Sequence, residues 1–404
     1  MKVKALKSQI TMIMIMGIVL FISIGIVMYL SKTAVKKSSQ SAEKKIQTTA
    51  LETRAIKEFA ASCLDKLSKD ALVLLGKQGG YIYKTQGGTI IPFSDSDEGK
   101  VFIKNNNMEV VYNIKPLLLN VPLPYSTSIP DYPWLIFPYV PYGPINQNIK
   151  TFNGIFGVNS MPPLNTSHGP HSVQIQIETF IDANMEKCLD FSVFANEGYE
   201  IKAAKSKTKV FIGARDISIV SEIPLKVTNI KTQEKAEFKE FSTVLNIRLG
   251  EMYYFIKEII DKDISDIKFD IQDTTNNKNS FSIKVSENTY QKDDLISVKD
   301  GQSILYGQPF EYTFGRKNRA PALYYIKDEV IGFDQGDQID EDDIKGNSDL
   351  KAEDPDEDNP IIETKALLSN PNLPTVMDRP QIMFRVEASD GMLSDYQIIT
   401  ANRR

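Results

Sequence analysis

The stretch Gln9–Lys32 constrains this chain more than any other feature of its sequence. From Ile10 to Leu30 it contains no charged residue. A helix needs about 20 such residues to cross the hydrocarbon core of a bilayer. We therefore expect a short basic cytoplasmic leader at 1–9 and a transmembrane helix at 10–31, with the lipid bilayer as its partner.

A cleaved signal peptide is the alternative for this stretch. The apolar part of a signal peptide usually has about 7–15 residues and precedes a small-x-small cleavage site. Here the run is longer, and Ser31-Lys32-Thr33-Ala34 lacks that pattern, which favours an uncleaved anchor. Orientation stays open, because lysines flank the segment equally on both sides. They are Lys2, Lys4 and Lys7 before it, and Lys32, Lys36 and Lys37 after it.

The charge balance bears on the partner. The chain has 404 residues, a net charge of −5 and ordinary globular fractions of charged (25%) and hydrophobic (42%) residues. Binding to phosphate backbones requires a concentrated basic surface. A nucleic-acid partner is therefore not expected.

The chain has two cysteines, Cys63 and Cys188, and both occur in a Cys-Leu-Asp context near the end of a predicted helix. Two cysteines are too few for a four-thiolate metal site, but they suffice for one disulfide. Disulfides persist outside the cytosol. The alternative is two unrelated buried thiols. Asn165-Thr166-Ser167 is a glycosylation sequon, which agrees with an extracellular location.

Hydrophobic periodicity predicts an α+β fold. Apolar residues at three- and four-residue steps favour a stalk helix within 32–78, as well as helices at 173–190 and 249–260. The stalk helix would either assemble with other copies or pack against its own domain. Alternating or short apolar runs predict antiparallel strands in a central domain, 79–314, including Ile267–Ile271, Phe281–Val285 and Leu295–Val298.

A segment rich in proline and aromatic residues, 121–163, interrupts this domain. Its prolines exclude a helix and remove hydrogen-bond donors that a central strand needs. The segment is either an extended strap buried against the domain or an interface, because large exposed apolar patches mark contact sites. The interface candidates are Trp134, Phe137, Tyr139 and Tyr142.

Several phrases resemble a known family. The anchor beginning Gln9-Ile10-Thr11, the helix ending Cys63-Leu64-Asp65, the phrase Leu74–Tyr81 and the later Cys188-Leu189-Asp190-Phe191 are similar to uncharacterised membrane-anchored proteins of small-genome archaea. The resemblance covers roughly residues 5–260. It implies an outward-facing archaeal surface protein and carries no known activity.

Residues 315–404 resemble the cadherin-like and immunoglobulin-like repeats of microbial surface proteins. The matching phrases are Asn318–Pro321, the acidic run Glu353–Asp358 and the hairpin Phe384–Asp395. An acidic insertion, 328–349, departs from the repeat pattern. The resemblance implies an all-β sandwich with a calcium site. Ca²⁺ takes six to eight oxygen ligands, and the candidate ligands are Asp354, Asp356, Asp358, Asp390 and Asn318. The alternative is a solvated acidic loop.

Enzymatic motifs do not stand out. The only two histidines, His168 and His171, lie in one Gly-Pro loop, and a transition-metal site needs more ligands than these. We therefore expect no catalytic residues and no cofactor other than calcium. The sequence predicts a structural or adhesion protein of the cell membrane, single-pass, with most of the chain extracellular and a protein or glycan partner. The alternatives are a pilus-like filament subunit that assembles through its N-terminal helix and, more distantly, a membrane-tethered hydrolase.

Overall fold

The computed structural model describes residues 53–90, 102–105, 108–116, 134–136, 140–141, 156–166, 171–324, 332–333, 350–367 and 381–403. The predicted leader and transmembrane segment, 1–31, lie outside these ranges, as does the first part of the expected stalk helix. No helix among the described residues is both long and apolar enough to cross a bilayer. This finding contradicts the predicted single-pass membrane localisation with an extracellular bulk.

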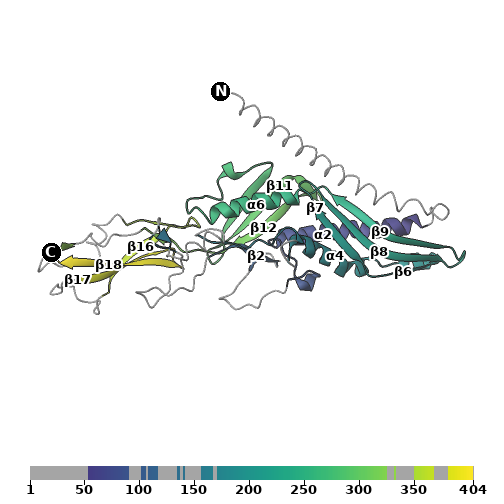
Figure 1. Cartoon of the computed structure of the whole chain (residues 1–404), viewed down its shortest axis with the longest axis horizontal. Coiled ribbons are helices and arrows are strands. Elements are labelled where there is room, and N and C mark those ends of the chain that lie inside the picture. Colours follow the sequence, from purple (N-terminus) through teal and green to yellow (C-terminus); the bar gives the residue numbers. More distant parts are fainter. Residues whose placement is uncertain are drawn as a thin grey trace, which may run out of the picture. The chain divides into compact units, whose positions relative to one another are not determined.

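The predicted α+β class is also wrong, because the described chain is mostly β with few helices (Figure 1). The helices are α2 (Arg54–Lys77), α4 (Val173–Cys188), α5 (Ser192–Asn196) and α6 (Leu249–Asp263), with 3-10 turns at Lys84–Gln86 and Thr274–Asn276. The strands in the first half are β1 (Phe102–Asn105), β2 (Met108–Lys115), β3 (Trp134–Ile136), β4 (Val140–Pro141), β5 (Val158–Asn159), β6 (Tyr199–Ala203) and β7 (Lys207–Ile212). Those that follow are β8 (Ile217–Asn229), β9 (Lys235–Leu245), β10 (Phe281–Tyr290), β11 (Asp293–Leu305), β12 (Gln308–Arg316), β13 (Ala322–Leu323), β14 (Gly332–Phe333), β15 (Ala352–Glu353), β16 (Ile361–Ala366), β17 (Gln381–Ser389) and β18 (Ser394–Arg403).

The described residues divide into two compact units. The smaller unit comprises 53–62, 189–206 and 221–241, and the larger comprises the rest. In the smaller unit, β6 pairs antiparallel with β8, from Tyr199 opposite Asn229 to Ala203 opposite Leu225. Its core contains Ile56, Val227 and Ala236, packed with partly buried residues such as Phe191 and Phe194.

A six-stranded sheet forms the centre of the larger unit. Its order is β1-β2-β12-β11-β10, with β5 also paired to β2. The pairings are antiparallel except that β12 runs parallel to β2. Helix α6 lies along this sheet (Figure 1), and Phe255 of the helix stacks on Phe281 of β10 with ring centroids 5.0 Å apart. The sheet thereby brings the start of β11 and the end of β12 beside the C-terminal end of α6.

The C-terminal strands form a second sheet, in the order β14-β18-β17-β16, beside the two-stranded pair β13-β15. Alternate residues of β17 and β18 build its core, which contains Phe384, Val386, Ala388, Ile399 and Ala401. Such alternation is the period of a half-buried strand. This small sheet and strand pair do not by themselves support the expected cadherin-like or immunoglobulin-like sandwich, and nothing in the fold supports an archaeal source.

The strand predicted at Ile267–Ile271 was wrong, because the chain turns there. The carboxylate of Asp266 accepts a hydrogen bond from the backbone N–H of Lys268 at 3.0 Å. The carboxylate of Asp270 accepts one from the N–H of Gln272 at 2.7 Å. Aspartates that bond to the backbone two residues ahead stabilise turns in place of strands.

Gly76 is the point of closest approach between α2 and the central sheet. A Cβ atom there would collide with the carbonyl oxygen of Glu311 and lie 3.2 Å from the ring of Phe310. Alanine usually stabilises a helix relative to glycine. Here we expect Gly76→Ala to lower the free energy of unfolding by about 1–3 kcal/mol, because overpacking forces the helix away from β12.

Urea denaturation of the full chain measures this change, and Gly301→Ala is the matched control. A Cβ at Gly301 has Ser280 O as its nearest neighbour, at 3.7 Å, which is an ordinary contact. Greater stability in Gly76→Ala than in the parent would show that α2 does not pack this closely.

Candidate metal centre

An ionic cluster lies in the larger unit, where β12 ends and the chain enters the C-terminal strands. Most of its members are buried, and most sit in a turn or within two residues of the end of a helix or strand. It holds more carboxylates than cations. The aspartates are Asp263, Asp293, Asp294, Asp354, Asp356, Asp358 and Asp390, and the cations are Lys292, Arg316 and Arg319.

Arg316, the last residue of β12, is the centre of one half of the cluster. Its side chain is 1% exposed and reaches Asp263 Oδ1 at 3.1 Å and Asp294 Oδ2 at 2.6 Å. Its Nε lies 3.3 Å from Asp356 Oδ1. Burial acts to lower the pKa of Arg316, but these three carboxylates outweigh it and raise the pKa. The guanidinium therefore stays charged although it is buried.

Arg319 binds two of the same carboxylates. Its Nη1 lies 2.8 Å from Asp263 Oδ2, and its Nη2 lies 2.7 Å from Asp356 Oδ1. The backbone N–H of Arg319 also donates to Asp356 Oδ2 at 2.5 Å. Both oxygens of Asp356 are thus engaged by arginine. Asp356 was predicted as a calcium ligand, and the structure instead places it as the counter-ion of the two arginines.

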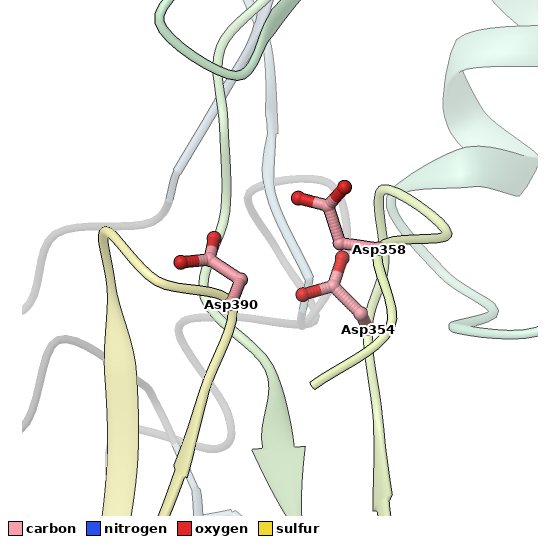
Figure 2. Close-up of side chains that lie close together, drawn as sticks. All are labelled: Asp354, Asp358 and Asp390. Atoms are coloured by element: carbon pink, nitrogen blue, oxygen red, sulfur yellow. The ribbon is translucent and has the colours of Figure 1, made fainter. Parts of the chain in front are cut away.

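Three other predicted ligands do come together. Asp354, Asp358 and Asp390 each offer a carboxylate oxygen within 4.8 Å of the others. Figure 2 shows that Asp354 and Asp358 belong to one loop, while Asp390 comes from the turn between β17 and β18. Asp354 is 6% exposed and Asp390 is 8% exposed. We call these three residues the aspartate triad.

Local hydrogen bonds hold two members of the triad in place. Asp354 Oδ1 accepts the N–H of Asp356 at 2.8 Å. Asp390 Oδ1 accepts the N–H groups of Met392 and Leu393 at 2.6 and 2.7 Å. These bonds orient the carboxylates without neutralising them. The backbone therefore fixes the orientation of these two carboxylates.

Two buried oxygen atoms beside the triad have no donor. Asp354 Oδ2 and Asn318 Oδ1 are fully buried and accept no hydrogen bond from any described residue. Asn318 Nδ2 donates to Asp390 Oδ2 at 2.7 Å, so the amide nitrogen must face Asp390, and the oxygen is left over. Leaving a buried acceptor unsatisfied costs about 1–3 kcal/mol. A cation bound at the triad would supply a partner for Asp354 Oδ2.

The triad has the dimensions of a calcium site. Ca²⁺ binds oxygen at about 2.3–2.6 Å, so two ligands on opposite sides of the ion lie about 4.6–5.2 Å apart. One carboxylate oxygen from each member of the triad lies within 4.8 Å of the other two, which is compatible with this limit. Asn318, which is bonded to Asp390, carries an unpartnered side-chain oxygen that is a candidate fourth ligand. Mg²⁺ is the poorer match, because it demands near-octahedral geometry at about 2.0–2.1 Å and keeps several waters.

The electrostatics of the triad also favour a cation. Burial raises the pKa of Asp354 to about 7, and the nearby carboxylates of Asp356, Asp358 and Asp390 add to the rise. A carboxylate whose pKa rises in this way lacks sufficient positive charge around it. A bound divalent ion would supply that charge.

The remaining predicted site residues lie elsewhere. Cys63 and Cys188 form a disulfide, with Cα atoms 5.8 Å apart, that links α2 to the end of α4. Asn165 is exposed, but Ser167 of its sequon lies outside the described residues. Trp134 lies in β3, which pairs with β4, while Phe137, Tyr139 and Tyr142 lie outside the described part.

Sequence reasoning missed the two arginines and Asp263, Asp293 and Asp294. Arg316 and its partner Asp263 are 53 residues apart, and Arg319 and Asp356 are 37 apart. No local pattern joins residues so distant. The one usable signal was the pair Asp293-Asp294 at the start of an apolar strand, where charge is unusual.

The comparisons with known proteins give no relative. No protein-family model matches this chain, and no curated protein matches it.

Proposed function

We propose that this chain is a non-catalytic structural or interaction protein whose C-terminal strands are fixed to its central sheet by one divalent cation, with calcium as the best-fitting ion. The ligands are the aspartate triad and Asn318 Oδ1. The observation that carries the proposal is the pair of buried, unpartnered oxygens next to three convergent carboxylates. An acidic loop in solvent would not bury acceptors in this way.

The ligands come from three different segments of the chain, which supports a structural role for the ion. Asn318 follows β12, Asp354 and Asp358 lie between β15 and β16, and Asp390 lies between β17 and β18. The Asn318–Asp390 hydrogen bond joins the first of these segments to the third, and the Arg319–Asp356 ion pair joins the first to the second. An ion ligated by all of them would cross-link the segments, as structural metals do when binding energy becomes folding energy.

The charges of the ionic cluster support the non-catalytic part of the proposal. Asp263, Asp294 and Asp356 are paired with arginines inside the fold. A general base must lie within hydrogen-bond reach of the proton that it takes from a substrate. Carboxylates that are buried and already paired with arginines are better suited to a structural role. The cluster is built to hold segments together.

Calcium titration of the full chain tests the proposal. We expect heat on calorimetric addition of Ca²⁺ and a rise in Tm, since an ion at a hundredfold excess over its Kd stabilises the native state by about 2.7 kcal/mol. Asp354→Asn should abolish both effects. The ion-free Asp354→Asn protein should be at least as stable as the parent, because the substitution removes one of several crowded negative charges.

Glu363→Gln is the matched control. Glu363 is an exposed carboxylate on β16, outside the ionic cluster, and pairs with Lys365. This variant should bind Ca²⁺ as the parent does. A parent protein that gives no heat and no change in Tm at millimolar Ca²⁺ would rule the proposed function out.

A further inference from the structure

Lys292 forms an ion pair with one member of the aspartate triad. Its Nζ lies 2.8 Å from Asp358 Oδ2, and both side chains are mostly shielded from solvent, at 25% and 20% exposed. Asp354 and Asp390 accept bonds from backbone and amide N–H groups. Among the ion pairs of the described residues, the one between Lys292 and Asp358 is the only one that places a cation on a member of the triad.

A tight turn of the backbone places Lys292 next to the triad. Lys292 lies in the two-residue turn between β10 and β11, where Tyr290 pairs with Asp293. Gln291, the other turn residue, has a φ of 49°, the left-handed conformation that such tight hairpin turns require. The next residues, Asp293 and Asp294, are anchored to Asn318 and Arg316. The hairpin thus places the backbone of Lys292 near the triad, and its side chain reaches Asp358.

We propose that Lys292 is a built-in competitor for the divalent cation, one that holds the triad in the ion-free protein and sets the concentration at which the ion displaces it. This inference rests on the proposed function, because it names how the same site is regulated. In the ion-free state the ammonium group neutralises Asp358. In the ion-bound state Asp358 ligates the ion, and the ammonium group moves away into solvent.

The physical reason is charge repulsion at short range. A cation ligated by Asp358 would lie within a few ångströms of an ammonium group still bound to the same carboxylate. Two positive charges at such a distance repel strongly in a shielded site. Binding must therefore break the Lys292–Asp358 pair, and the free energy of that pair is subtracted from the affinity for the ion.

Calorimetric Ca²⁺ titration of full-length variants tests this inference. Lys292→Met keeps an unbranched side chain only one atom shorter and removes its charge, so Ca²⁺ should bind about tenfold tighter or more. Lys292→Arg keeps the charge and should bind Ca²⁺ about as the parent does. Lys299→Met is the control for net charge, since Lys299 lies on β11, the strand that follows Lys292, and pairs with Glu311 at 3.8 Å. Its affinity should not change.

The outcomes separate the two proposals. Ca²⁺ binding that is tighter in Lys292→Met than in the parent, with Lys292→Arg and Lys299→Met binding as the parent does, supports the competitor role. Binding of equal or lower affinity in Lys292→Met than in the parent overturns it and leaves the proposed function standing. The absence of binding in the parent and in every lysine variant overturns both.

Discussion

Arg316→Met is expected to lower the free energy of unfolding by about 3–5 kcal/mol, the cost of removing one partner from a buried ion pair. Arg316 contacts Asp263, Asp294 and Asp356, so its loss leaves several buried carboxylates short of positive charge. Methionine fills part of the volume and provides no hydrogen-bond donor. Urea denaturation followed by circular dichroism measures the change.

Arg215→Met provides the matched control for this substitution. Arg215 pairs with Glu251 at 3.4 Å, but its side chain is 83% exposed. Exposed pairs contribute little because water and salt screen them. The control variant should therefore unfold at the same urea concentration as the parent. Equal stability of Arg316→Met and the parent would mean that the arginine does not hold this cluster together.

Removing the disulfide should have the second large effect. The double substitution Cys63→Ser with Cys188→Ser is expected to destabilise the protein by about 2–5 kcal/mol, because the bond closes a long loop in the unfolded chain. The two cysteines are separated by 125 residues. The expected drop in Tm is measured by scanning calorimetry under oxidising conditions.

Reductant supplies the internal comparison for the disulfide. Dithiothreitol should lower the Tm of the parent to about the value of the double variant, and it should leave the double variant itself unchanged. If parent and variant melt together under oxidising conditions, the bond does not form in the folded protein.

Local patterns in the sequence identified the helices better than the class of the fold. The helix expected at 173–190 is α4, and the one at 249–260 is α6, because their apolar residues recur with the helical period. Two strands were predicted too short, Phe281–Val285 and Leu295–Val298. Leu295–Val298 is only the middle of β11, which runs from Asp293 to Leu305 past a bulge between Asp300 and Ile304. The full length of β11 was not predicted because the strand contains buried polar residues, which interrupt the apolar pattern.

Asp300 explains why the strand was misread. Its carboxylate is buried and accepts hydrogen bonds from Arg248 Nε at 2.9 Å and from Ser303. In a sequence, an aspartate inside an apolar run marks the end of a strand. In the fold, an arginine 52 residues away compensates it. Tertiary pairing of this kind is not visible in local propensity.

At the metal centre, too, local sequence patterns predicted some features, and pairing between distant residues decided the others. The acidic run at 354–358 and the hairpin aspartate were visible as oxygen ligands in the sequence, and the fold brings Asp354, Asp358 and Asp390 together. Asp356 has the same spacing and the same chemistry, yet Arg319 takes both of its oxygens. Only the fold distinguishes a carboxylate whose partners are arginines from one that lies beside other carboxylates.

The most direct test of the metal centre is an anomalous difference map from crystals of the full chain grown with Ca²⁺ or with Tb³⁺ as its substitute. We expect one strong peak at about 2.3–2.6 Å from oxygens of Asp354, Asp358, Asp390 and Asn318. A map with no peak at this position, or with the ion bound elsewhere and Asp354 Oδ2 still without a partner, would contradict the account.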